Sequence, residues 1–254
     1  MKIKKESLNG IELGLNYTPN KISSLFVNYS HSYQSSSLDR LFSFSTGIFT
    51  GYVEPSQANN YTLGYNNIQK SNKFKIAVYY IDLKNEIYYY PGINWTGARN
   101  TNIDKSHKYG VDLYDKYIFN SDFNVAFNYN YVQAIIDDEI ENGENYAGNK
   151  LPGVSDHNVK ATINYLPNEY ATISLTQVYR SESYAANDFN NNFSQKQDAY
   201  YSTDIAATYA KDNWEIFAKI NNLFDQSNGL WIKDDSIYPI NFTRTALAGF
   251  KLKY

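Results

Sequence analysis

Short and long connections alternate along this 254-residue chain, between segments in which apolar and polar side chains take turns. Phe123, Val125 and Phe127 share one face of an extended segment, and Asn124 and Ala126 share the other. This period of two is typical of β-strands, and no convincing helical stripe occurs. Eleven strands are predicted, at 10–17, 21–34, 58–67, 73–90, 105–119, 123–136, 157–165, 170–183, 198–209, 214–223 and 241–254.

The connections constrain the topology more than the strands do. Five are short turns, near 18–20, 68–72, 120–122, 166–169 and 210–213, and five are long, at 35–57, 91–104, 137–156, 184–197 and 224–240. Long loops are uncommon in compact domains unless they are functional. Strict alternation predicts an all-β, antiparallel up-and-down transmembrane β-barrel, with short periplasmic turns and long extracellular loops. The chain then ends at the periplasmic side.

Composition is consistent with such a barrel. The 26 Tyr and 14 Phe can supply interfacial aromatic girdles. Mean hydropathy is −0.56, and no segment approaches the roughly 18 apolar residues of a membrane helix. A net charge of −3 without a basic stripe argues against nucleic acid as a partner, and the absence of Cys excludes disulfides and thiolate metal sites.

The C-terminal stretch 249–254 carries Gly249, Leu252 and a terminal aromatic, Tyr254. This ending resembles the assembly signal of bacterial outer-membrane proteins, although Ala248 stands where that signal often has a polar residue. The resemblance implies the barrel-assembly machinery as a partner. An odd number of strands that ends in the periplasm would have to begin at the loop end, so we expect further strands upstream. The segment 1–6 lacks the apolar region of a signal peptide.

A motif close to the C-terminus resembles that of TonB-dependent outer-membrane receptors. It comprises Asn221, Asn222, Leu223, Phe224 and Asp225, and Arg244 in the last strand is similar to an arginine of the same family. Thr243 replaces the usual glycine. The segment 148–157 is a third similarity, with Ser155 in place of a proline.

The resemblance implies the C-terminal half of a barrel of about 22 strands. Residues 1–254 would form one partial transmembrane barrel, without the plug domain and the N-terminal strands. The intact protein is expected in the bacterial outer membrane, importing a metal chelate, foremost a ferric siderophore, with cobalamin or haem as alternatives. Outer-membrane lipid and the TonB complex, acting through the plug, are the other implied partners. No enzymatic activity, cofactor or metal site is expected.

Candidate ligand contacts are aromatic and arginine residues of the long connections and of the outer end of one strand, because such side chains anchor recognition surfaces and Arg favours anionic chelates. They are Trp95, Arg99, Arg180, Tyr184 and Trp231. For each Tyr or Trp near a strand end, a place in the aromatic girdle is the alternative.

Two other interpretations remain open. A smaller, self-contained outer-membrane barrel acting as a protease or phospholipase would need His31 or His107 beside an acidic or Ser partner. A secreted β-sandwich is the other. The acidic runs 137–143 and 188–192 invite a calcium site but lack the register of an EF-hand loop, so solvated loops are preferred.

Overall fold

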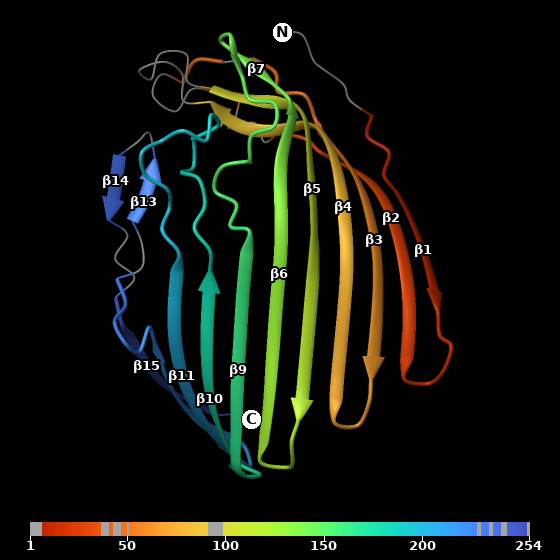
Figure 1. The fold of residues 1–254 in the computed structure, drawn as a ribbon. Coiled ribbons are helices and arrows are strands. Elements are labelled where there is room, and N and C mark those ends of the chain that lie inside the picture. Colours follow the sequence, from red (N-terminus) through yellow and green to blue (C-terminus); the bar gives the residue numbers. More distant parts are fainter. Residues whose placement is uncertain are drawn as a thin grey trace.

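The computed structural model describes residues 7–36, 41–42, 47–49, 51–90, 99–227, 230–233, 236–239 and 243–252. Eleven strands form one antiparallel sheet that curves into an open half-barrel (Figure 1). Their order is β1-β2-β3-β4-β5-β6-β9-β10-β11-β12-β15, so every strand pairs with its neighbour along the chain apart from short hairpins within the long connections. The prediction of eleven antiparallel strands is confirmed.

The strands of this sheet are β1 (Ile11–Tyr17), β2 (Ser23–Gln34), β3 (Ser56–Ile68), β4 (Asn72–Tyr90), β5 (Arg99–Ile118), β6 (Phe123–Asp138), β9 (His157–Asn168), β10 (Ala171–Arg180), β11 (Tyr200–Lys211), β12 (Trp214–Asn221) and β15 (Thr245–Leu252). We call the end of the sheet with the short turns the turn end and the opposite end the rim. No helix among the described residues has the length and apolarity to cross a membrane.

Three short turns are closed by the same pattern of hydrogen bonds to an asparagine side chain. The side-chain carbonyl of Asn20 accepts hydrogen bonds from the N–H groups two and three residues later, at 3.0 and 2.8 Å. Asn120 and Asn168 do the same in their turns. Asn side chains commonly close turns in this way. The repeated Asn therefore explains why the chain reverses tightly at this end.

One face of the sheet is apolar and exposed. Leu63, Val78, Ile163 and Ile216 lie on it, each between 45% and 52% exposed. Aromatic contacts border this apolar band at both ends. The rings in contact near the turn end are Tyr65–Phe74, Tyr117–Phe119, Phe123–Tyr165 and Tyr209–Trp214. Those near the rim are Tyr29–Tyr61, Tyr80–His107, Tyr129–His157 and Tyr179–Tyr201.

The other face is polar, and aromatic rings lie over several of its glycines. Phe217 pairs directly with Gly249, and a Cβ on that glycine would lie 2.7 Å from the ring Cε1. Phe26 covers Gly64 in the same way. Glycine is required at these positions because the ring occupies the space of a side chain.

The sheet is not closed. β1 and β15 stand at the two ends of the strand order, and every residue of β1 is exposed. Each therefore presents a bare edge, as expected for part of a larger barrel.

Several boundaries differ from the prediction. The connection predicted at 91–104 shrinks to 91–98, because β5 begins at Arg99 and pairs there with the end of β4. Two hairpins were not predicted: β7 (Ile140–Glu141) with β8 (Glu144–Asn145), and β13 (Leu230–Lys233) with β14 (Ser236–Pro239). Trp95 and Tyr254 lie outside the described residues.

Candidate functional site at the rim

The rim ends of β4 and β5 bend across the top of the half-barrel (Figure 1). The bend coincides with Asn85, whose φ is 58°, a backbone conformation that Asn tolerates better than most residues. The Asn102 side chain holds it, donating to the carbonyl of Asn85 at 2.7 Å and to that of Glu54 at 2.9 Å. The two strands therefore form a partial roof.

A small hydrophobic core fastens this roof to the long connections. Phe189, from the β10–β11 connection, packs against Tyr88 and Tyr146, with ring centroids 4.6 and 5.7 Å apart. The core consists of Tyr88, Ile103, Ala134, Ile136, Tyr146, Leu151 and Phe189, with Val154 at its margin. The 139–156 and 181–199 connections are consequently packed rather than freely solvated.

Carboxylates are buried within this packing. Glu139 is 5% exposed and accepts hydrogen bonds from the Tyr88 hydroxyl at 3.3 Å and the Asp104 N–H at 2.9 Å. Burial raises the pKa of Glu139, opposed mainly by the Asp104 N–H. Glu141 forms an ion pair with Arg99, Oε1 to Nη2, at 2.8 Å.

A cavity of about 330 Å³ lies beneath the roof. Its wall is mostly apolar, and its two charged side chains, Lys108 and Glu86, form an ion pair, Nζ to Oε1, at 2.6 Å. Ser106 also donates to Glu86, at 2.6 Å. The apolar lining includes Tyr88, Tyr89, Leu151, Pro152 and Phe189. A mostly apolar pocket with a few fixed polar groups is the usual form of a small-molecule site.

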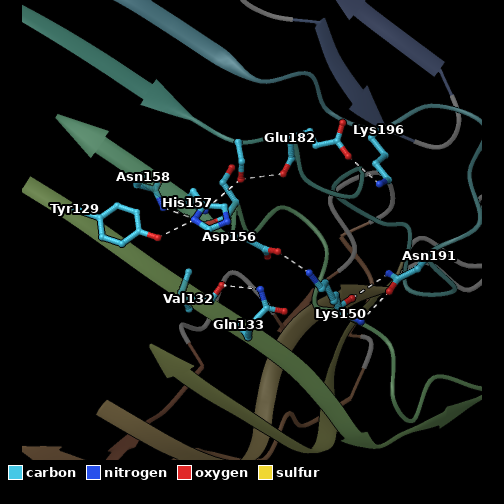
Figure 2. Close-up of polar contacts among 12 residues, drawn as sticks. Tyr129, Val132, Gln133, Lys150, Asp156, His157, Asn158, Glu182, Asn191 and Lys196 are labelled. Atoms are coloured by element: carbon cyan, nitrogen blue, oxygen red, sulfur yellow. Dashed lines mark hydrogen bonds and ion pairs between the residues drawn. The ribbon is translucent and has the colours of Figure 1, made fainter. Parts of the chain in front are cut away.

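A second, polar cavity of about 240 Å³ lies beside it, where β9 begins and β10 ends (Figure 2). Two ion pairs frame it, Lys150 with Asp156 at 2.6 Å and Lys196 with Glu182 at 2.9 Å. The Nζ of Lys196 also lies 5.0 Å from the ring centroid of Tyr184.

The predicted ligand residues fall in different places. Tyr184 lines the polar cavity, and Arg180 ends β10, its guanidinium 5.8 Å from the ring of Tyr200. Placing Arg99 in a loop was wrong: it begins β5 and is engaged by Glu141. Trp231 lies in β13, its backbone opposite Tyr238. Among the described side chains of this set, Arg99, Arg180 and Tyr184 therefore do not line one common cavity.

Sequence reasoning missed Phe189, Glu86 and Lys108. A lone aromatic in a polar loop was the available sign for Phe189. Glu86 and Lys108 gave no local sign, because they meet only through the pairing of β4 with β5.

The family motif forms a clamp between strands. Asn222 is 4% exposed with φ 51°, and its side chain both accepts from and donates to the Gln226 backbone, each at 2.9 Å. Asp225 accepts from the Arg244 N–H at 2.8 Å, and Asn221 donates to Thr245 at 3.1 Å. Leu223 is held through its N–H by the Thr203 carbonyl at 2.7 Å, whereas Phe224 is exposed. The motif thus joins β11, β12 and β15.

The three histidines lie on the apolar face close to the rim. His31 contacts Asn59 and His107 contacts Asp137, each through Nδ1 at 2.8 Å, and His157 contacts the Tyr129 hydroxyl at 2.9 Å. Within the described chain, neither His31 nor His107 contacts a serine hydroxyl. His107 thus has the acidic partner that the enzyme alternative names, and the pair lies on the apolar face of the sheet.

The two acidic runs are occupied by protein contacts. Asp188 accepts from the N–H groups of Asn192 and Phe193, at 2.9 and 3.2 Å. Across the residues that the structure describes, no group of three or more His, Cys, Asp or Glu is arranged to hold a metal ion.

Comparison with known proteins identifies the family. Residues 12–223 match the model described as TonB dependent receptor-like, beta-barrel. Similar solved structures include the ferric yersiniabactin uptake receptor FyuA from Yersinia pestis (18% identity, 96% of this chain and 37% of that chain, TM-score 0.71). The ferric citrate transporter FecA is also similar (19% identity, 95% of this chain and 38% of that chain, TM-score 0.73). So is the copper transporter OprC (11% identity, 98% of this chain and 40% of that chain, TM-score 0.76).

These likenesses show a shared fold, and the chain spans 37% to 40% of the length of these three proteins. No curated protein sequence matches the chain. The family match covers most of the residues and agrees with the open eleven-stranded sheet. The chain therefore belongs to the TonB-dependent receptor-like β-barrel family.

Proposed function

We propose that this chain is the C-terminal part of the wall of a bacterial outer-membrane receptor. The apolar face supports this proposal. Phe74 and Tyr80 of β4 belong to its two aromatic borders, and the six residue steps from one to the other correspond to about 20 Å along the strand. This arrangement resembles the apolar band of outer-membrane barrels, which is about 25 Å tall and flanked by aromatic girdles. The rim would then lie outside the cell, and the turn end and C-terminus in the periplasm.

The receptor would import a metal chelate, foremost a ferric siderophore, with cobalamin or haem as alternatives. The observation that carries this proposal is the roofed rim, where packed connections enclose an apolar and a polar cavity side by side. An iron chelate combines apolar surface with charge, so adjoining cavities of both kinds suit it. The similar structures named above include receptors for ferric chelates.

Tyr184 and Arg180 are the proposed contacts that fit best, because each lines a cavity. Trp95 and Trp231 remain proposed contacts from two other long connections. Arg99 would act indirectly, by holding Glu141 and with it the β7 hairpin.

The two bare edges suggest how the rest of the receptor is arranged. We propose that preceding strands pair with β1 and close on β15, and that a plug domain fills the lumen. Transport would then be energised by the TonB complex pulling on that plug. Insertion would depend on the barrel-assembly machinery, with Gly249, Leu252 and Tyr254 as its signal.

Growth on defined chelates tests the proposal. The complete gene would be expressed in a strain that lacks its own chelate receptors and grown with ferric siderophores, haem or cobalamin as single sources. Rescue by at least one chelate, lost when TonB is deleted, is expected. Correctly inserted protein that rescues growth on none of them would refute import of these chelates.

A further inference from the structure

The polar face of β4, β5, β9 and β10 is strongly basic between the turn end and the Asn85 bend. Its six basic side chains are Lys73, Lys75, Lys108, Lys116, Lys160 and Arg180, and its acidic side chain is Asp112. Glu86, just past the bend, forms an ion pair with Lys108. The whole chain carries a net charge of −3. Positive charge is therefore concentrated on this wall and does not reflect the overall composition.

Three of these cations border one cavity of about 560 Å³, which we call the basic trough: Lys75, Lys160 and Arg180. Strand register places them. Lys75 pairs with Tyr114, Tyr114 with Asn128, and Asn128 with Lys160, so the two lysines stand on one level three strands apart. At about 4.8 Å per strand this is a width of roughly 14 Å.

Arg180 completes the trough on the rim side. It ends the next strand, pairs with Asn158, and lies two residues nearer the rim than the partner of Lys160. Lys160 and Arg180 therefore stand at one side of the trough and Lys75 at the other.

The protein supplies no carboxylate to these three cations within the parts of the chain that the structure describes. The nearest favourable contacts are with aromatic rings, Lys75 with Phe26 at 5.7 Å and Arg180 with Tyr200 at 5.8 Å. Asp112 is the one acidic residue in the lining, and it accepts a hydrogen bond from Asn130 at 2.7 Å. The carboxylate of Glu86 forms an ion pair with Lys108. Unpaired positive charges around a concavity attract a mobile anion.

Amide and hydroxyl groups line the floor between the cations. They belong to Tyr114, Asn128, Asn130 and Asn158. The side-chain amides of Asn130 and Asn158 already donate to protein oxygens, so Tyr114 and Asn128 are the donors that remain for a ligand in the described part of this floor. Asn and Tyr side chains donate hydrogen bonds to oxygen acceptors without adding charge. A site with cations at its edges and neutral donors between them favours a molecule with several separated acidic oxygens. The volume lies within the range of small-molecule sites.

We propose that the basic trough binds a small polyanion, specifically a polycarboxylate or its metal chelate, on the inner wall below the rim. This inference rests on the proposed function, because it assumes that a chelate entering at the rim passes along the polar face. The trough would act as a second site that favours anionic over cationic chelates.

The test uses the protein expressed from its complete gene and purified in detergent. Citrate and ferric citrate are the probes, titrated by calorimetry at low and at physiological salt. The double variant Lys160→Gln/Arg180→Gln is compared with Lys84→Gln/Lys105→Gln, which removes two positive charges from the other side of the sheet, where Lys84 and Lys105 pair. The conservative pair Lys160→Arg/Arg180→Lys keeps the charges, and heat-modifiability on gels reports folding in every variant.

We expect the trough variant to weaken binding of both probes by about tenfold or more at low salt, with a smaller loss at high salt. The matched control should stay within about twofold, and the conservative pair should bind. Equal losses in trough and control variants, or no loss in either, would overturn the proposal. A folded wild-type protein that binds neither citrate nor ferric citrate would also overturn it.

The outcomes separate the two proposals. Chelate-dependent growth with trough-independent citrate binding would leave the proposed function standing and refute the trough. Trough-dependent binding without growth on any chelate would leave the trough standing and refute the proposed function.

Discussion

Replacing Gly249 with alanine should destabilise the sheet through the ring of Phe217. The new Cβ would lie 2.7 Å from Cε1 and 3.1 Å from Cε2 of that ring, and carbon atoms pack best at about 3.5–4.0 Å. The ring must therefore withdraw by roughly 1 Å. Overpacking of this kind costs about 1–3 kcal/mol, and the half-buried ring of Phe217 places the cost in the lower half of that range.

A gain opposes part of this cost. Glycine in a strand is less favourable than alanine by about 0.5–1 kcal/mol, because the unfolded chain loses more freedom. The net loss in the free energy of unfolding should be about 1 kcal/mol. Urea titration in phospholipid vesicles, followed by tryptophan fluorescence, measures this free energy of unfolding.

A double-mutant cycle identifies the cause. In the Phe217→Leu background the clash is relieved, so Gly249→Ala should become neutral or stabilising. Gly14→Ala is the matched control, since its nearest neighbour is the Asn28 side chain at 3.7 Å, an ordinary contact. If Gly249→Ala costs the same free energy in both backgrounds, the packing argument is refuted. A defect confined to insertion in cells would instead indicate recognition by the assembly machinery.

Other predictions concern the clamp, the rim and the edges. Asn222→Ala removes two side-chain hydrogen bonds and places alanine at positive φ, so it should cost about 2–4 kcal/mol, with Asn213→Ala in an exposed turn as the near-neutral control. Burial raises the pKa of Glu139, so ionisation of this carboxyl destabilises the packed rim. The amide exchange rates of residues 139–151, corrected for intrinsic rates, should therefore increase as pH rises through that pKa. The Glu139→Gln variant should abolish the increase. Unchanged pH dependence in that variant would contradict the assignment. The isolated 254-residue chain should associate through β1 and β15 in detergent-free buffer, and a sharp monomer peak in size exclusion would disprove this.

The strands and the short turns were predictable because their causes are local. The period of two marks the faces, and Asn20, Asn120 and Asn168 close their turns with neighbouring N–H groups. The start of β5 was missed because its residues are polar, and their extended conformation follows from pairing with β4.

The rim was the least predictable part. Tyr88, Ile136 and Phe189 belong to three different segments, and Phe189 lies between polar residues in the sequence. Only the fold brings them together, so no periodic pattern revealed that the long connections are packed. The basic trough escaped notice for the same reason, since Lys75 and Lys160 share a level only through the register of four strands.

Membrane embedding of the apolar face tests the central claim most directly. The chain has no cysteine, so a single introduced cysteine can carry a spin label at each position of β9. In vesicles, labels at Val159, Ala161 and Ile163 should be accessible to oxygen dissolved in lipid, and labels at Thr162 and Asn164 should not. Alternation with a period of two is the result expected of an outer-membrane receptor wall. Uniform accessibility to a water-soluble relaxation agent at all five positions would contradict it.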